Sequence, residues 1–266
     1  MILRFPIIPQ NLLVIILIML VACNKPSWIS SFDVVKIIRT HFQDKVGHSW
    51  TLDPMASWLM ILWVGKWTKQ LTELIGLDKA YETTIDFSLL TDTWDASFWE
   101  KEERFEIKES GLEINWGITP IPSIETIKNK LDSIIYQENK EILLPLPTFS
   151  AKKQNWRRLY KDARKGKAEI QEKPMKIYNY EIISYDFPYL KVRFSVGSWT
   201  YIRSIGYWLG QELNLWWALV QLERVSIWKF NLSEIGNKDC AKWNIKWKER
   251  CILYKTVELE SIKNPD

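Results

Sequence analysis

The stretch VGHSWTLDPMASWLMILWVGKWTK, residues 46–69, organises our interpretation of this chain. One of only two histidines, His48, is closely followed by a threonine, an aspartate and a proline, and then by an apolar run. An Asp-Pro step favours a turn, so we expect Asp53 on an ordered loop, where catalytic carboxylates are common. The alternative is that Asp53 only caps a helix formed by the apolar run.

This stretch resembles the catalytic motif of the TruB family of tRNA pseudouridine synthases, approximately GHxGTLDPxAxGxLxxxxGxxTK. The residues in family register are Gly47, His48, Thr51, Leu52, Asp53, Pro54, Ala56, Leu59, Gly65, Thr68 and Lys69. Other segments resemble family elements in family order between Val21 and Leu232, namely KAYE at Tyr81, SAKKQNW at Trp156, GSWTYIR at Tyr201 and ALVQLERVSIWKF at Leu222. One departure is Glu223, which stands where the family has the first of two arginines, whereas Arg224 matches the second.

Tryptophan stands at many positions where the resemblance implies glycine. These are Trp28, Trp50, Trp58, Trp63, Trp67, Trp94, Trp156, Trp199, Trp216, Trp217 and Trp228. The chain has 16 Trp and only 10 Gly among 266 residues, whereas glycine usually makes up about 7% of a protein. We therefore hypothesise that the source reads UGA as glycine, and that these codons are translated here as tryptophan. The alternative is a genuine Trp-rich protein; for Trp99, Trp116, Trp208, Trp243 and Trp247 no family residue is assigned.

The resemblance implies an α+β fold, the pseudouridine synthase core, with a mixed, mainly antiparallel sheet flanked by helices and a central RNA-binding cleft. We expect a hydrophobic N-terminal extension at 1–20, a catalytic domain at 21–232 and a short basic tail at 233–266, too short for a complete RNA-binding PUA domain. The run LLVIILIMLVAC, residues 12–23, imitates a lipoprotein signal. We favour instead a buried strand leading into KPSW, with a true start that could be internal at Met19.

Local patterns predict the other elements. A near capping box at Ser30 and Asp33 opens a predicted helix that continues to Phe42. Further helices are expected at 68–75, at 123–136 and after GSWTYIR, and strands at 81–87, 176–185 and 189–196. The charged segment 101–119 is expected to be an irregular insertion. Residues 152–167 carry eight Lys or Arg and one acid, with apolar residues at helical spacing.

Catalytic roles follow from the resemblance. Asp53 would be the nucleophile or base at the ribose, and Arg203 would keep its carboxylate ionised in a dry cleft. Tyr81 would stack on the turned-out uracil and help to remove the C5 proton, while Tyr201 and Leu222 would line the pocket. The alternative is that Tyr81 has only a structural role, as a half-buried tyrosine in a strand.

RNA contacts are expected from basic and loop residues. His48 would enter the T-loop and hold the nucleotide out, although a turn histidine bonded to backbone is the alternative. Lys25 and Lys69 would support the catalytic loop or the RNA backbone. Lys152, Arg157, Arg158 and Arg164 are candidates for phosphate contacts. A charge run is more often a solvated surface than a binding site, but the interleaved tyrosine and the resemblance favour RNA.

The implied function is conversion of uridine 55 in the T-loop of tRNA to pseudouridine, an isomerisation that requires extraction of the target base from the folded loop. Neither cofactor nor metal is expected, and the three cysteines suit a reducing cytosol. We expect a cytoplasmic monomer that binds tRNA and no membrane. Two other classes stay open: a non-catalytic RNA-binding or tRNA-chaperone protein on the same core, and a lipidated surface protein.

Overall fold

Two units make up the structure, a computed structural model that describes residues 18–48, 53, 55–65, 76–96, 102–108, 111–114, 117–135, 141–147, 153–154, 157–158, 171–234, 244–247 and 250–257. The first unit contains residues 1–52, 58–75 and 232–266, and the second contains residues 53–57 and 76–231. The segment expected to be a C-terminal tail therefore belongs to the same unit as the N-terminus. Among the helices in the described ranges, none is long and apolar enough to cross a membrane.

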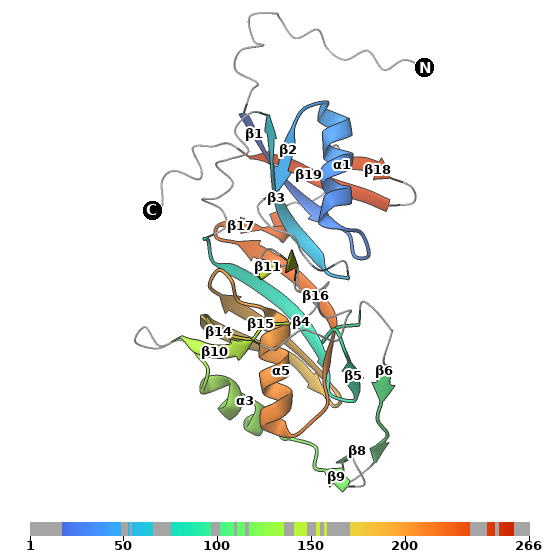
Figure 1. Ribbon diagram of the computed structural model, residues 1–266, viewed down its shortest axis with the longest axis vertical. Helices are drawn as coiled ribbons and strands as arrows, with labels where there is room; N and C mark the ends of the chain where they lie inside the picture. Colours follow the sequence, from blue (N-terminus) through green and yellow to red (C-terminus); the bar gives the residue numbers. More distant parts are fainter. Residues whose placement is uncertain are drawn as a thin grey trace, which may run out of the picture. The chain divides into compact units, whose positions relative to one another are not determined.

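The first unit is an antiparallel sheet with one helix, α1 (Ser31–Phe42), beside it (Figure 1). Its strands are β1 (Ile18–Lys25), β2 (Val46–His48), β3 (Ser57–Gly65), β18 (Asn244–Trp247) and β19 (Arg250–Val257), and a short 3-10 helix, η3, covers Leu232–Glu234. Strand β1 pairs with β3 on one side and with β19 on the other, while β2 pairs with β3 and β18 with β19. The side chain of Cys23 is fully buried in β1. The N-terminal run thus ends in the buried strand that we expected, although β1 begins inside the expected extension.

Helix α1 shows why the local sequence pattern was informative. The Ser30 hydroxyl accepts a hydrogen bond from the Asp33 backbone N–H at 3.1 Å, and the Asp33 carboxylate accepts one from the Ser30 N–H at 3.3 Å. These two bonds satisfy backbone donors that the first helical turn leaves without partners. Gln43 in the left-handed conformation ends the helix. The predicted capping box and helix are confirmed.

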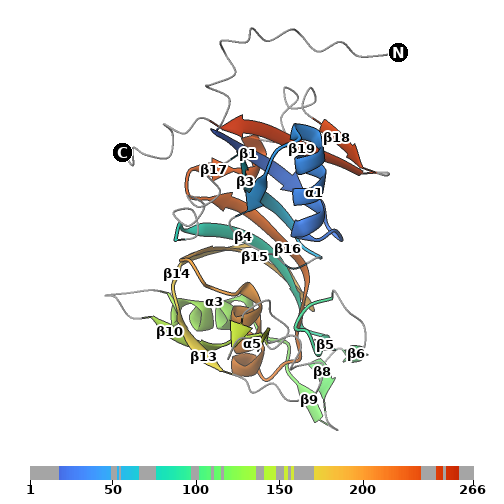
Figure 2. The same ribbon diagram turned by 45° about the horizontal axis from the view of Figure 1, so that its top comes forward.

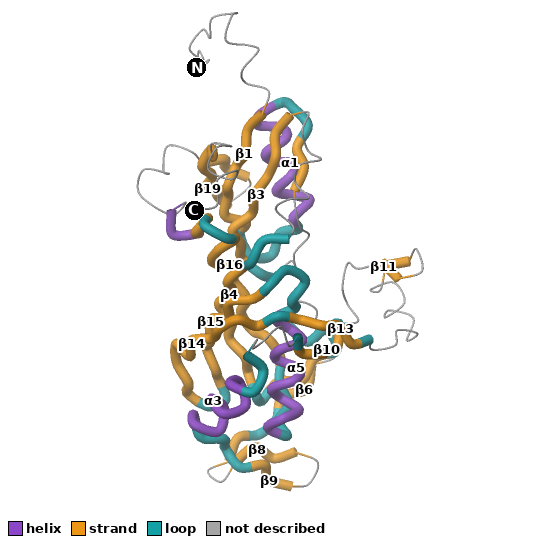
Figure 3. Tube along the Cα trace, turned by 90° about the vertical axis from the view of Figure 1, so that its left-hand side faces the viewer, coloured by secondary structure: helices purple, strands orange, loops and turns teal. Residues whose placement is uncertain are grey.

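The second unit is built on a sheet of strands that pair antiparallel in the order β14–β15–β4–β16, with the short β17 beside β16. The strands are β4 (Lys79–Asp86), β14 (Ile177–Asp186), β15 (Tyr189–Val196), β16 (Ala218–Ile227) and β17 (Phe230–Asn231). Helices α3 (Ile124–Asp132) and α5 (Ile202–Leu213) lie on one side of this sheet (Figures 2 and 3). The predicted strand alternation in β15 is confirmed, because every second side chain from Leu190 to Val196 is fully buried.

Short ribbons complete the second unit. They are β5 (Leu89–Thr91) with β6 (Glu102–Arg104); β7 (Ile107–Lys108), β8 (Gly111–Ile114) and β9 (Gly117–Thr119); β10 (Ile142–Pro145) with β13 (Glu172–Met175); and β11 (Lys153–Gln154) with β12 (Arg157–Arg158). Within the basic segment only the short hairpin of β11 and β12 is described; the apolar residues at helical spacing lie outside the described residues. The helix expected at 68–75 lies outside the described residues.

The α+β class is confirmed, with mainly antiparallel strand pairing and few helices among the described residues. Helix α5 packs against β4, β16 and β10. This placement matters because α5 begins one residue before Arg203. The central RNA-binding cleft stays a prediction.

Candidate active site

Arg203 is the centre of the polar site in the second unit. Its guanidinium Nη2 donates to Asp53 Oδ1 at 2.9 Å, and Nη1 donates to the carbonyl oxygen of Thr93 at 2.8 Å. Nη1 also lies 3.3 Å from Asp95 Oδ2. The side chains of Arg203 and Asp95 are almost completely buried, whereas the Asp53 side chain is 31% exposed. One buried cation therefore bridges a buried carboxylate and one that solvent can reach.

Asp53 lies on a tight loop, as predicted. Its backbone carbonyl accepts a hydrogen bond from the Ala56 N–H at 3.2 Å, and β3 begins at the next residue, Ser57. The alternative in which Asp53 caps a following helix is wrong, because the apolar run forms a strand. The Arg203 guanidinium stabilises negative charge on the Asp53 carboxylate, and such charge-assisted bonds are among the strongest in proteins.

Tyr81 belongs to the same site. It lies on β4 directly opposite Arg224 of β16, whose guanidinium hydrogen-bonds to the tyrosine hydroxyl. Burial raises the pKa of Tyr81; the Arg224 charge and hydrogen bond lower it, and the nearby Asp53 charge raises it. Two strands thus place a tyrosine within the electrostatic reach of the aspartate on the loop.

Tyr201 and Leu222 flank these groups. Tyr201 is the N-cap residue of α5, and burial raises its pKa, while Arg203 lowers it and Asp53 and Tyr81 raise it. Leu222 lies on β16 opposite Thr83, and its side chain is buried on the sheet face that also carries Arg224 and Tyr81. The structure therefore brings together Asp53, Tyr81, Arg203 and Tyr201, with Leu222 one cross-strand pair away from Tyr81.

Two of the expected RNA-binding residues lie in the first unit. The Lys25 side chain is fully buried, and its ammonium donates to the carbonyl oxygens of Pro26 at 3.0 Å and Ile29 at 2.8 Å. Lys25 thus holds the turn that leads into α1. His48 ends β2 and is half-buried. RNA contacts by either residue stay predictions.

The remaining expected RNA contacts cannot be placed on this structure. Lys69, Lys152 and Arg164 lie outside the described residues, and the side chains of Arg157 and Arg158 in β12 are likewise not described. Their assignment stays a prediction based on the resemblance and on local charge.

Asp95 is a site residue that the sequence analysis missed. It follows the segment TDTW at residues 91–94, in which the resemblance drew attention to Trp94 at a family glycine position and not to the acid beside it. The Asp95 carboxylate accepts a hydrogen bond from the Thr93 hydroxyl at 3.1 Å and faces Arg203. An aspartate beside threonines that can orient it was the available signal, but its arginine partner is more than 100 residues away in the chain.

In fold, the chain is similar to chains in two solved structures of protein complexes. A chain in the crystal structure of a Cbf5-Nop10-Gar1 complex matches with a TM-score of 0.58 and 19% sequence identity over 82% of this chain. A chain in the structure of an H/ACA RNP bound to a substrate RNA containing 2'-deoxyuridine matches with a TM-score of 0.55 and 18% identity. This chain spans about half the length of those two chains (51% and 50%). At these identities the likeness shows the fold.

Sequence comparison gives the family. Residues 37–202 match the family described as TruB family pseudouridylate synthase (N terminal domain). The chain is 32% identical to tRNA pseudouridine synthase B of Caldicellulosiruptor saccharolyticus over 241 residues, 90% of this chain and 78% of the relative. It is 34% identical to the protein of that name from Francisella tularensis subsp. tularensis over 92% of this chain and 76% of the relative. This chain belongs to the TruB family of pseudouridylate synthases.

Proposed function

We propose that this tRNA pseudouridine synthase isomerises uridine 55 of the T-loop to pseudouridine. The observation that carries the proposal is the ion pair between Asp53 and Arg203, with Tyr81 in the same site. Family membership supports the same reaction. A catalytic carboxylate needs both access and a fixed charge, and Asp53 combines partial exposure with a buried arginine partner.

The reaction breaks the bond from ribose C1' to uracil N1 and forms one from C1' to C5. Asp53 acts at the ribose, as nucleophile at C1' or as base, while the released uracil turns in the pocket. The C5 proton then leaves, and N1 gains a proton, so the atoms balance without any external reactant. We therefore propose that neither metal nor cofactor takes part, and that the enzyme acts as a monomer in the cytoplasm.

Each neighbour of Asp53 has a role in this scheme. Arg203 holds the carboxylate in its charged form and in one orientation. Tyr81 stacks on the uracil and helps to remove the C5 proton; burial raises the pKa of its hydroxyl, and Arg224 opposes that effect. Tyr201 and Leu222 line the pocket for a base taken out of its stack.

RNA binding is proposed for the residues that resemble family contacts. His48 holds the extracted nucleotide out of the T-loop, and Lys69, Lys152 and Arg164 contact the phosphate backbone. Lys25 supports the loop between β1 and α1, which agrees with its two bonds to carbonyl oxygens of that loop. Phosphate contacts position RNA and make binding sensitive to salt.

The test is tritium release from C5-labelled uridine in a T-arm minihelix. Release that disappears in Asp53→Asn, while salt-sensitive binding of the minihelix persists, is the expected result. Binding without any release by the unmodified chain would overturn the proposal in favour of an RNA-binding or tRNA-chaperone protein on the same fold. The assay should be run with the chain as printed and with glycine at the family glycine positions.

We also propose that glycine occupies most of these tryptophan positions in the natural protein, because the source reads UGA as glycine. Six residues other than glycine have positive φ in the described ranges, and four of them are tryptophans at family glycine positions: Trp28 (67°), Trp94 (65°), Trp199 (73°) and Trp228 (48°). The left-handed region is natural for glycine and strained for a bulky side chain. The other two, Gln43 and Asn214, are ordinary helix C-caps.

Buried indole groups support the same proposal. Within the described part of the chain, the buried Nε1 donors of Trp63 and Trp216 have no hydrogen-bond acceptor. A buried donor without an acceptor costs about 1–3 kcal/mol, and glycine would remove the group. Mass spectrometry of the native protein provides the test. Peptides with glycine at 28 and 199 are expected, and peptides with tryptophan there would refute the recoding.

A further inference from the structure

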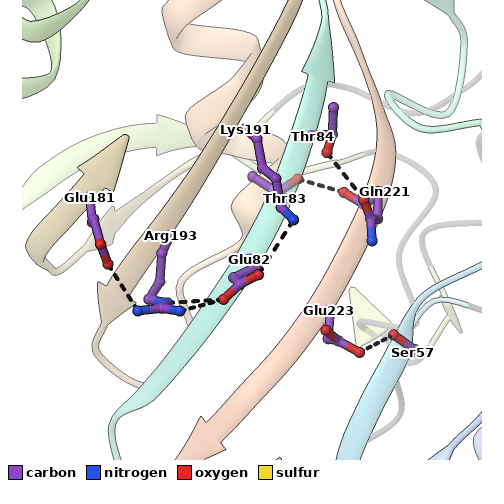
Figure 4. Close-up of polar contacts among 9 residues, drawn as sticks. All are labelled: Ser57, Glu82, Thr83, Thr84, Glu181, Lys191, Arg193, Gln221 and Glu223. Atoms are coloured by element: carbon purple, nitrogen blue, oxygen red, sulfur yellow. Dashed lines mark hydrogen bonds and ion pairs between the residues drawn. The ribbon is translucent and has the colours of Figure 1, made fainter. Parts of the chain in front are cut away.

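A row of charged side chains runs across strands β14, β15, β4 and β16 of the second unit (Figure 4). In order of the strands they are Glu181, Arg193, Glu82 and Glu223, each opposite its neighbour in the pairing register. Arg193 donates from Nε to Glu82 Oε1 at 3.1 Å and from Nη1 to Glu181 Oε2 at 2.9 Å. Lys191 Nζ also lies 3.9 Å from Glu82. The charge of Glu82 is therefore balanced from β15.

Glu223, at the end of this row, turns to a different partner. Its Oε1 accepts a hydrogen bond from the hydroxyl of Ser57 at 2.7 Å (Figure 4). Ser57 is the first residue of β3 and directly follows the loop that carries Asp53. Like charges directly opposite each other in a sheet are unfavourable, and Glu223 lies opposite Glu82. Neutralisation of Glu82 by Arg193 lowers that repulsion and leaves the Glu223 carboxylate to accept from Ser57.

The loop between Asp53 and Ser57 is short, so a bond at one end constrains the other. Ala56 N–H donates to the Asp53 carbonyl at 3.2 Å, which closes a turn immediately before Ser57. Asp53 is therefore held by its carboxylate at Arg203, by its carbonyl at Ala56, and, through Ser57, by Glu223. Strand β16 thus presents Arg224 toward Tyr81 on one face and Glu223 toward the Asp53 loop on the other.

We propose that Glu223 and Ser57 form a positioning pair that fixes the Asp53 loop for catalysis. This inference rests on the proposed function for its kinetic consequence. Neither side chain needs to touch the substrate, because both act through the position of Asp53. Glu223 stands where the resemblance implies an arginine, whose guanidinium has no acceptor for the Ser57 hydroxyl.

The experiment compares Ser57→Ala and Glu223→Ala with Glu223→Gln in the full chain. The two alanine variants should lower kcat about tenfold, or about 1.4 kcal/mol, with KM nearly unchanged, because one charge-assisted hydrogen bond is lost. Glu223→Gln keeps an oxygen that accepts from Ser57 and should restore most of kcat. The double alanine variant should be no worse than either single variant, since both remove the same bond.

A matched control lies two residues away on the same strand and face. Gln221 Oε1 accepts a hydrogen bond from the Thr84 hydroxyl at 3.2 Å, and this bond does not involve the Asp53 loop (Figure 4). Gln221→Ala removes it and should leave kcat at the unmodified value. Equal losses of kcat in Gln221→Ala and Glu223→Ala would overturn the proposal.

A second measurement does not depend on activity. Hydrogen exchange of the Ala56 amide should become about tenfold faster in Ser57→Ala and Glu223→Ala, but not in Gln221→Ala, because its bond to Asp53 loosens. Unchanged exchange in the first two variants would refute the positioning pair even if the chain proved inactive. Faster exchange with no tritium release by the unmodified chain would instead keep the pair and refute the proposed function.

Discussion

The two main helices begin in the same way and then differ at the cap. Each has a Ser-Trp pair just before its start, Ser27-Trp28 before α1 and Ser198-Trp199 before α5. Both tryptophans have positive φ and are 53% exposed. Helix α1 then continues with the complete capping box of Ser30 and Asp33, whereas α5 begins at Tyr201 with no side-chain cap.

The difference extends to charge. Helix α1 has an acid in its first turn, as the helix dipole favours, but α5 has Arg203 there and no acid. The negative charges that suit the start of α5 come from Asp53 and Asp95, which lie on distant segments. The start of α1 is stabilised by neighbouring residues and contributes to folding. The start of α5 is paired with carboxylates from distant segments, and these residues form the candidate active site.

The largest expected effect comes from Arg203→Met. The change leaves the buried Asp95 and the half-exposed Asp53 without their shared cation, and removing one partner of a buried pair costs about 3–5 kcal/mol. Urea unfolding measures the loss. Glu212→Gln at the other end of α5 breaks an exposed pair with Lys130 and should cost at most about 1 kcal/mol. Equal losses would mean that the start of α5 is no more dependent on ion pairing than its end.

A second prediction concerns the buried ammonium group of Lys79 on β4, the strand that also carries Tyr81. Burial, with a smaller contribution from the Arg224 charge, lowers the pKa of Lys79 to about 8 from its ordinary value of 10.5. Below pH 8 both the folded and the unfolded chain hold this proton, and the folded chain has the full penalty. Between pH 8 and 10.5 the unfolded chain binds more protons, so the free energy of unfolding rises with pH.

We expect a rise of about 2 kcal/mol between pH 8 and 10, measured by urea unfolding, which Lys79→Met should abolish. The window stops at pH 10 because Tyr180 and Tyr185, whose pKa values are raised to about 12, reverse the slope above it. A profile in Lys79→Met that rises as steeply as that of the unmodified chain would exclude Lys79 as the source.

The same contrast between local and distant contacts separates what the sequence predicted from what it did not. The capping box of α1 and the alternation of β15 are local patterns, and both elements form as predicted. The pairing of Asp53 with Arg203 came from family resemblance, because the two residues are 150 positions apart and no local pattern connects them. Asp95 was missed for that reason.

The pattern in the basic segment stays a prediction. Its apolar residues at helical spacing lie outside the described residues, and the described part contains only the short hairpin of β11 and β12.

The Ser-Trp pairs that precede α1 and α5 give a third prediction. Trp28→Gly and Trp199→Gly should each stabilise the chain by about 1 kcal/mol, because glycine adopts the left-handed conformation without strain. Both side chains are half exposed, so their removal loses little burial. Trp208→Gly inside α5 is the control and should destabilise the chain by about 1 kcal/mol or more, since glycine is a poor helix former. Thermal unfolding distinguishes the signs, and destabilisation at 28 and 199 would contradict the assignment of glycine there.

An effect no larger than these is expected at the start of α1. Ser30→Ala removes the acceptor for the Asp33 N–H and should cost about 1 kcal/mol. Hydrogen bonds from Ser30 hold the pKa of Asp33 below its ordinary value of 3.8, so their stabilisation is present above that pH and is lost as the pH falls through the lower folded value. Urea unfolding at pH 7 and at pH 3 should therefore show a smaller difference between Ser30→Ala and the unmodified chain at the lower pH. Turnover should stay unchanged, because this cap contributes to folding alone; a loss of kcat in Ser30→Ala would mean that α1 also positions part of the catalytic machinery.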